Sequence, residues 1–277
     1  MSHGEPHAAV RLLVSDVDGT LVRDDKSLPD ANRDAILALA AAGVPTTLIS
    51  SRPPSGMLSL AAALRLTGPL AAFNGGTLFD ADGTIRFAHR LVAADAAVML
   101  RLLDVPGVAR WVYADGSWFV PDLDNVHLAR ERRAAAVDPV IRSDFAALDG
   151  RIDKLVGVSD DHQLLQQLEE RAREMIGPRA TIARSQAYYL DITHRLANKG
   201  DGIAALAEAF GVELAQVAAL GDMTNDLPMF ARAGLSVAMG QSPGCVRAAA
   251  GATATTNEED GVADAIRRFI RPGLVRS

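Results

Sequence analysis

Two aspartates stand one residue apart at the end of a short apolar run. The run VRLLVSDVDGT covers residues 10–20, and its carboxylates belong to Asp16 and Asp18. In an extended chain, residues i and i+2 point to the same side, so both carboxylates can face one pocket while Val17 points away. Two carboxylates so close repel each other, which raises one pKa unless a cation intervenes. The pair therefore suits unequal roles, with one carboxylate ionised as a nucleophile and the other carrying a proton.

Further polar residues follow other apolar runs along the chain. In an open α/β sheet the carboxyl ends of the strands form the ligand site, so these residues are expected to lie together. Asp222 and Asp226 add oxygen ligands of the kind that Mg²⁺ prefers. The residues that follow the later runs are Ser50, Ser51 and Arg52; Asn74, Gly75 and Gly76; and Asp222, Asn225 and Asp226 in GDMTND, while Lys199 opens a helix.

Each of these residues also has a structural interpretation. Asp16 and Asp18 alone would be more typical of a turn at the end of a strand. Asp226 is expected both to cap the helix that contains Pro228 and to serve the site. The pair Asn74 and Gly75 could form only a turn, and the sequence leaves Arg52 equally open to a phosphate contact and a structural ion pair.

Lysine is rare in this chain. Of its 28 basic residues only Lys26, Lys154 and Lys199 are lysines, which leaves 25 arginines. The two side chains differ in geometry and hydration, so a chain that prefers arginine this strongly has a specific reason wherever it uses lysine.

Alternating strands and helices must position these residues. This order predicts an α/β fold with a doubly wound parallel sheet, similar to a Rossmann sheet. The apolar and turn patterns predict a strand at 10–14, a helix at 29–42 with Ser27 as a possible cap, a strand at 44–49, a helix at 55–66 and a strand at 70–73.

A different pattern interrupts this alternation. TLFDADGTIRF and WVYADGSWFV place Asp-Gly between apolar residues, which indicates hairpins. Helices are expected at about 94–103 and 124–136, with Trp111 and Trp118 packing around a hairpin. The alternation then returns, with helices at 201–210, from 226 and at 261–270, and strands at 217–220 and 235–239. We therefore predict a discontinuous core domain of residues 1–82 and 192–277 and an inserted α+β cap domain of residues 83–191.

Composition narrows the classes of function. The formal net charge of −6 argues against binding nucleic acid or an acidic membrane, but leaves small anionic substrates open. The longest apolar run, around 35–45, is too short to span a bilayer. The single cysteine, Cys245, is interpreted as a buried small residue and permits no internal disulfide. The first ten residues lack the plan of a signal peptide, so we expect a cytoplasmic protein.

Four motifs in order resemble those of the haloacid dehalogenase superfamily. They are DVDGT, Ser50 within LISSRP, NKG at 198–200 and GDMTND at 221–226. The long insertion between the second and third motifs, together with FNGG at 73–76, looks like the Cof-type branch with a type IIB cap. One departure is Ser50-Ser51-Arg52 where the family usually has Thr-Gly-Arg; Ser50 keeps the hydroxyl.

The resemblance implies a phosphatase that uses Mg²⁺ and an aspartyl-phosphate intermediate. Asp16 would be the nucleophile, Asp18 the general acid and base, and Lys199 would offset charge repulsion. Mg²⁺ would be held by Asp16, the Asp18 backbone carbonyl, Asp222 and Asp226. The transferring phosphoryl group would be bound by Ser50, Ser51, Arg52, Asn74, Gly75 and Asn225.

The substrate is expected to be a small phosphorylated metabolite, with a sugar phosphate implied only by the resemblance. Alternatives are a phosphomutase with the same chemistry, a receiver-like signalling module and a non-catalytic metabolite-binding protein. The cap residues His127, Arg184 and Tyr188 are interpreted as surface or packing residues. The sequence is compatible with a monomer or a small homo-oligomer.

Overall fold

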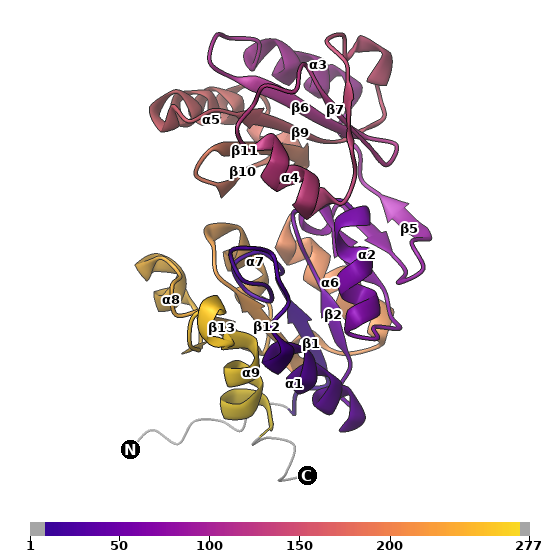
Figure 1. Ribbon diagram of the computed structural model, residues 1–277, viewed down its shortest axis with the longest axis vertical. Coiled ribbons are helices and arrows are strands. Elements are labelled where there is room, and N and C mark those ends of the chain that lie inside the picture. Colours follow the sequence, from indigo (N-terminus) through magenta and orange to yellow (C-terminus); the bar gives the residue numbers. More distant parts are fainter. Residues whose placement is uncertain (1–8, 272–277) are drawn as a thin grey trace.

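A computed structural model describes residues 9–271 and shows two bodies stacked along the long axis of the molecule (Figure 1). The body that carries both ends of the described chain is built on a five-stranded parallel sheet. Its strand order is β14-β13-β12-β1-β2. The strands are β1 (Leu12–Ser15), β2 (Thr46–Leu48), β12 (Val217–Gly221), β13 (Leu235–Ala238) and β14 (Ala252–Thr253).

Strand β1 lies inside this sheet, between β12 and β2, and is fully buried. Successive side chains point to opposite faces, so Leu13 joins one apolar cluster and its neighbours Leu12 and Val14 join another. The first cluster is covered by helices α1 (Asp30–Ala41) and α9 (Gly261–Ala265), the second by α6 (Lys199–Phe210) and α7 (Leu227–Phe230). Burial on both faces is the reason for the continuous apolar run that predicted this strand.

The third predicted strand has a second partner besides the parallel neighbour that was expected. Strand β3 (Leu70–Ala72) meets the parallel sheet through a parallel bridge between Ile49 and Ala71, and the Ser50 N–H donates to the Ala71 carbonyl at 2.9 Å. Its main partner is the antiparallel strand β4 (Thr77–Phe79), which in turn pairs with β5 (Ile85–Ala88). These three strands form a separate small sheet beside the core.

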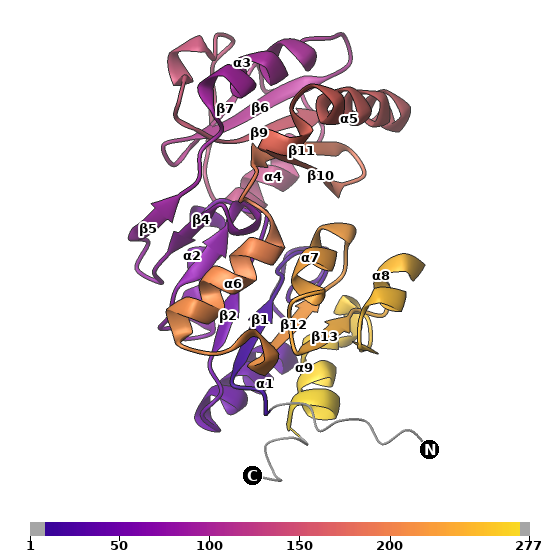
Figure 2. The same ribbon diagram turned by 180° about the vertical axis from the view of Figure 1, so that it is seen from behind.

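The second body is built on a six-stranded mixed sheet of order β10-β11-β9-β6-β7-β8. Helices α3 (Ala93–Leu102) and α5 (His162–Ile176) pack on its outer face, while α4 (Leu128–Ala135) lies on the side that faces the core (Figures 1 and 2). Trp111 and Trp118 are buried, as expected of residues that pack the cap. The strands are β6 (Ala109–Ala114), β7 (Ser117–Val120), β8 (Pro139–Ile141), β9 (Ile152–Val158), β10 (Ala180–Gln186) and β11 (Tyr189–His194).

The fold class predicted from the sequence is confirmed, since a parallel α/β core carries an inserted α+β body. The residue boundaries of the two domains stay a prediction. The structure shows that β5, which the sequence assigned to the cap, pairs with β4 instead of the six-stranded sheet. The hairpin of β4 and β5 therefore carries the small three-stranded sheet past the predicted boundary between residues 82 and 83.

Some local predictions were wrong. Ser27 does not cap α1, because Pro29 occupies the N-cap position and no side chain bonds there. Cys245 is exposed, because it lies in the short helix α8 (Gly244–Ala249), in which only Val246 is buried. The last helix, in contrast, is present at the predicted residues 261–270, with a change from α to π geometry at Ile266. Within residues 9–271, no helix has the length and apolarity needed to cross a membrane.

Candidate active site

The carboxyl ends of β1 and β12 lie side by side and bring two distant motifs together. Ser15 pairs with Leu220, and the backbone N–H of Asp16 donates to the Leu220 carbonyl at 2.9 Å. Asp222 follows β12 as Asp16 follows β1. The parallel register therefore sets their side chains next to each other at one edge of the sheet.

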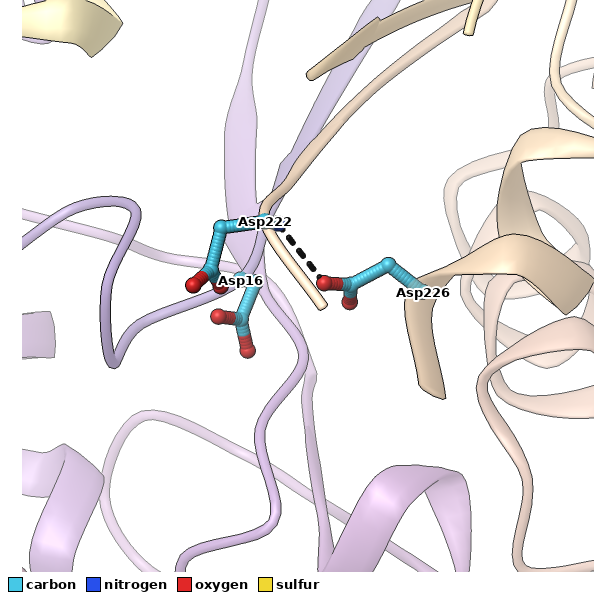
Figure 3. A group of neighbouring side chains, drawn as sticks. All are labelled: Asp16, Asp222 and Asp226. Carbon is cyan, nitrogen blue, oxygen red and sulfur yellow. Dashed lines mark hydrogen bonds between the residues drawn. The ribbon is translucent and has the colours of Figure 1, made fainter. Parts of the chain in front are cut away.

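Three buried carboxylates gather at this edge (Figure 3). Asp16, Asp222 and Asp226 each offer an oxygen atom, and these oxygens lie within 4.8 Å of one another. Asp226 is completely buried, and the other two residues are less than a tenth exposed. Closely spaced oxygen donors from carboxylates form a donor set that suits a hard divalent cation such as Mg²⁺.

Asp226 holds the loop that carries Asp222. Its Oδ2 accepts from the backbone N–H groups of Asp222 at 2.8 Å and Met223 at 2.9 Å, the former drawn as a dashed line in Figure 3. This close approach needs Gly221, since a Cβ there would lie 2.5 Å from the Asp226 Cγ. Asp226 occupies the N-cap position of α7, but its side chain makes no cap hydrogen bond. The predicted capping role was wrong, because the carboxylate is engaged by the preceding loop.

Lys199 links the DVDGT motif to the acidic loop. Its Nζ lies 2.5 Å from Asp16 Oδ1 and 2.6 Å from Asp226 Oδ1, and the side chain is almost completely buried. Burial alone would lower the pKa of Lys199, but the charges of Asp16 and Asp226 outweigh it and raise the pKa above the ordinary value. Asn198 starts helix α6 by accepting the Asp201 N–H at 2.9 Å, which places Lys199 at the first helical position.

Burial raises the pKa of Asp16 and of Asp222 above the ordinary value of an aspartate. For Asp16, Lys199 opposes this effect and Asp226 adds to it; for Asp222, the charges of Asp16 and Asp226 both add to it. A group of acids whose charges repel one another in a buried place favours either protons or a cation between them. The raised pKa values of Asp16 and Asp222 thus agree with a cation site formed by the three carboxylates.

Asp18 has different partners from Asp16. Arg52 donates from Nε to Asp18 Oδ2 at 2.7 Å and from Nη2 to Asp18 Oδ1 at 2.8 Å, and Lys26 Nζ lies 2.5 Å from Oδ1. Burial would raise the pKa of Asp18, but the hydrogen bonds and charges of Arg52 and Lys26 hold it well below its ordinary range. Two neighbouring aspartates therefore have pKa values shifted in opposite directions.

Core and cap enclose a small cavity of about 50 Å³ at this site. From the core it is lined by six residues that the sequence predicted as site residues and by Lys26 and Met223. Residues of the cap form its other wall. The six predicted residues are Asp16, Asp18, Ser51, Arg52, Asp222 and Asn225, and the cap residues are Arg130, Glu131, Ala134, Lys154, Ser185, Gln186, Tyr188 and Tyr189.

Three other predicted site residues, Ser50, Asn74 and Gly75, do not line this cavity. Ser50 is buried, and its Oγ accepts the backbone N–H of Arg52 at 3.2 Å. Asn74 is buried too, and its Oδ1 accepts from Asn225 Nδ2 at 3.3 Å. Gly75 has a φ of +96° and packs so closely on α6 that a Cβ would lie 2.6 Å from the Gly202 Cα. The tight contact gives Gly75 a packing role, while its role as a phosphate contact stays a prediction.

Comparison with known proteins adds an independent line of evidence. Residues 13–266 match the family of haloacid dehalogenase-like hydrolases. The chain belongs to this family. The resemblance predicted from the four motifs is thus confirmed, and membership in a hydrolase family argues against the receiver-like module.

Two curated relatives of this haloacid dehalogenase-like hydrolase are similar over nearly their full length. A putative phosphatase of Haemophilus influenzae is 28% identical over 254 residues, which are 91% of this chain and 95% of the relative. The 5-amino-6-(5-phospho-D-ribitylamino)uracil phosphatase YcsE of Bacillus subtilis is 28% identical over 263 residues, 94% of this chain and 96% of the relative.

Solved structures share the fold of this hydrolase. A haloacid dehalogenase-like hydrolase from Bacteroides thetaiotaomicron superimposes with a TM-score of 0.83 at 26% identity, covering 94% of this chain and 99% of the other. The subclass IIB sugar phosphatase BT4131 superimposes with a TM-score of 0.81 at 22% identity, covering 94% and 99%. The latter likeness shows the fold, including the cap.

The sequence missed several residues that line the cavity of this hydrolase. Tyr188 was interpreted as a packing residue, yet it faces the cavity and stacks on His127 with ring centroids 3.8 Å apart. Lys26 and Lys154 also line it, and Lys199 bonds to Asp16. All three lysines of the chain therefore meet at one site. The rarity of lysine was the signal that could have found the other two.

Proposed function

We propose that this chain is a Mg²⁺-dependent phosphomonoester hydrolase that acts on a small phosphorylated metabolite through an aspartyl-phosphate on Asp16. One observation supports this most directly. Asp16 lies against Lys199 and the carboxylates of Asp222 and Asp226, at the carboxyl end of the buried strand β1 and under the cap.

In this mechanism a carboxylate oxygen of Asp16 attacks phosphorus while the bond from phosphorus to the leaving oxygen breaks. The difficult displacement is thereby divided into two steps, and water then cleaves the aspartyl-phosphate. Lys199, with its Nζ 2.5 Å from Asp16, reduces the repulsion between the nucleophile and the dianionic ester. Burial of this pair away from water strengthens the interaction.

Asp18 would protonate the leaving oxygen and then take a proton from the attacking water. Its contacts with Arg52 and Lys26 favour the ionised form, which is the form that acts as the base. To act as the acid it must carry a proton, so these contacts must loosen when the ester is bound. Arg52 would do so by turning toward the phosphoryl oxygens, which carry more negative charge than one carboxylate.

The donor set fits Mg²⁺, which Asp16, Asp222, Asp226 and the backbone carbonyl of Asp18 would hold. When bound, the ion supplies positive charge that stabilises the phosphoryl oxygens. The remaining contacts to those oxygens are proposed for Ser51, Arg52 and Asn225, which line the cavity, and for Ser50, Asn74 and Gly75 from the adjoining loops.

The class of substrate is supported by relatives. The curated relatives include the phosphatase of a phosphoribityl-aminouracil and the HMP-PP phosphatase of Yersinia pestis, which is 27% identical over 232 residues. For this chain we propose only that the substrate is a small phosphorylated metabolite. We also propose that the protein is cytoplasmic and binds neither nucleic acid nor a membrane. A monomer or small homo-oligomer is also part of the proposal.

Substitution of the nucleophile tests the proposal. Asp16→Asn keeps the shape of the side chain but removes its nucleophilic charge, so we expect phosphate release from p-nitrophenyl phosphate with Mg²⁺ to be abolished. Removal of Mg²⁺ with EDTA should silence the enzyme, and added Mg²⁺ should restore it. Near-normal turnover by Asp16→Asn would refute the nucleophile, and full activity in EDTA would refute the metal. With a phosphate ester that carries a second hydroxyl in place of p-nitrophenyl phosphate, isomerised ester without free phosphate would indicate a phosphomutase.

A further inference from the structure

Two connections join the core body to the cap, and both carry the tripeptide His-Arg-Leu. The chain leaves the small sheet after β5 through residues 89–92, and it returns from β11 to α6 through residues 195–198 (Figure 2). The tripeptides are His89–Leu91 and His194–Leu196. Their imidazole rings stack on each other, with centroids 5.2 Å apart and planes inclined by 17°. The two connections are therefore in contact through their histidines.

The two rings are held by different bodies. His89 directly follows β5, and its backbone N–H donates to the carbonyl of Gly76 in the loop before β4, so this ring is fixed on the core side. His194 is the last residue of β11 and pairs with Ala180 of β10, so this ring is fixed on the cap sheet. The stack is thus a contact between cap and core, and a movement of the cap changes the distance between the rings.

The surroundings of His194 favour an uncharged ring. Burial lowers its pKa, and His89 and Arg195 lower it further, because a positive charge on either opposes a second one. The Nδ1 of His194 accepts the Leu196 N–H at 3.2 Å, which requires that this nitrogen carry no proton. Both histidines are only half-buried, so protons reach them from solvent. Protonation of His194 therefore breaks a hydrogen bond within the second connection as well as adding a charge to the stack.

Further charged groups near the connections are paired with opposite charges. Arg90 lies 3.4 Å from Asp115 and 3.4 Å from Asp153, both in the cap. Arg179, just before the facing strand β10, pairs with Asp95 at 2.9 Å. Burial raises the pKa of Asp153 to about 6, and Arg90 opposes this rise. Asp153 therefore titrates in the same pH range as a histidine, and a test of the stack needs a control at this residue.

We propose that the stack of His89 and His194 is a pH-sensitive contact, which supports the closed cap while both rings are neutral and releases it when they are protonated. Because the closed arrangement lowers the pKa of His194, it binds fewer protons than an arrangement in which the rings are apart. A fall in pH through the ordinary histidine pKa of about 6.5 therefore shifts the population toward an open cap. The inference concerns the position of the cap and does not depend on the proposed function.

Movement of the cap is required by the size of the cavity below it. The cavity between the two bodies has a volume of about 50 Å³, whereas ligand sites are roughly 300–1,000 Å³. A ligand enters only when the cap moves away from the core. The histidine stack lies at the connections about which this movement takes place, so its charge state acts on the balance between the closed and the open arrangement.

Single-molecule Förster transfer between cap and core tests the proposal. Cys245, the single cysteine, is exposed on α8 of the core, and Gln167→Cys adds a second labelling site at an exposed position of α5 in the cap. Without Mg²⁺ and at low ionic strength, we expect the ratio of open to closed molecules to rise about 4-fold or more from pH 7.5 to about pH 5.5. Two unit charges 5.2 Å apart account for about this factor even in water. Added salt should reduce the rise, because the rings are half-exposed.

Variants of the histidines identify the group responsible. His194→Asn keeps an acceptor close to the position of Nδ1 but takes up no proton, and His89→Gln removes the charge on the core side. Each should reduce the rise to less than about 2-fold, and the double variant should reduce it no further, because the repulsion needs both rings. His162→Gln, at an exposed histidine that begins α5, is the matched control and should behave as the wild type. Asp153→Asn should also keep the rise.

Circular dichroism at both pH values establishes that each variant is folded. A wild-type ratio that does not change with pH, or a closed population that grows in acid, would overturn the proposal. So would a rise that persists in both single histidine variants, or one that is lost in Asp153→Asn.

Discussion

Asp16, Asp222 and Lys199 are individually unfavourable where they lie, because each charge is buried. Removing one partner of a buried charge pair typically costs about 3–5 kcal/mol, so these residues depend on one another. Burial raises the pKa values of both aspartates, repulsion between neighbouring carboxylates adds to this, and the charge of Lys199 offsets it only in part. At the residue scale, the site is thus poised to exchange protons for a cation.

This exchange predicts how Mg²⁺ stabilisation depends on pH. Since the pKa values of Asp16 and Asp222 are raised in the folded protein, the folded protein holds protons that the unfolded chain has released. The free energy of unfolding of the metal-free protein therefore falls as the pH rises from the ordinary aspartate pKa toward the raised values. Mg²⁺ bound as proposed would replace these protons, so the rise in Tm that it causes should be larger at about pH 8 than at about pH 5.5.

Differential scanning fluorimetry with and without Mg²⁺ measures this effect. Asp222→Asn should weaken the pH dependence, whereas Asp30→Asn on the exposed surface of α1 should not alter it. A Mg²⁺-induced shift in Tm that is the same at both pH values would contradict the proposal that Asp16 and Asp222 exchange protons for Mg²⁺.

At the scale of elements, the cap rests on the core through α4 and α2 (Ser55–Ala63). The Ser55 hydroxyl donates to the Ala135 carbonyl at 2.7 Å, and Gly56 lies under the last turn of α4. A Cβ at Gly56 would lie 2.2 Å from the Ala134 carbonyl oxygen, a contact that backbone atoms cannot tolerate. The absence of a side chain at this position is therefore needed for the closed arrangement.

Gly56→Ala should consequently hinder closure while leaving the core site intact. We expect kcat/KM for a phosphate ester to fall about 10-fold or more, since a displacement of about 1 Å can cost about 100-fold in rate. Mg²⁺ affinity, measured by calorimetry, should stay within about 2-fold because none of the three clustered aspartates lies on α2 or α4. Gly244→Ala, at a position with open space around it, is the matched control. An unchanged kcat/KM in Gly56→Ala would show that close packing of residue 56 on α4 is not needed for catalysis.

At the scale of the whole molecule, the closed arrangement must alternate with an open one. Lys154 meets Ser51, α4 meets α2, and the cavity between the two bodies has room for little more than water. Turnover requires that the ester enter and that the alcohol leave. Closure then excludes bulk water, which strengthens the electrostatic contacts inside.

Small-angle X-ray scattering tests this alternation. Without ligands, we expect a larger radius of gyration than the closed structure gives. Mg²⁺ with orthovanadate, which mimics the transferring phosphoryl group, should reduce it toward the closed value. A ligand-free curve that already fits the closed structure, with no change when the ligands are added, would argue against cap movement.

Much of this protein could be predicted from local patterns. Strand β1 was predicted within two residues, because burial on both faces requires a continuous apolar run. The Asp-Gly turns predicted hairpins, and the hairpin of β6 and β7 is present with Asp115 and Gly116 at its turn. The antiparallel pairing of β3 with β4 was missed, because a short apolar strand looks the same whether its partner is parallel or antiparallel.

The sequence by itself determined the chemistry: the order of the acidic, hydroxyl and lysine motifs, and their position at the ends of apolar runs. Only the tertiary structure decided which residues line the same cavity or contact each other. Lys154 and Ser51 are 103 residues apart, and Lys26 meets Asp18 only through the fold of its loop. Local periodicity specifies an element and its buried face, whereas contacts between elements arise from packing of segments that are distant in the chain.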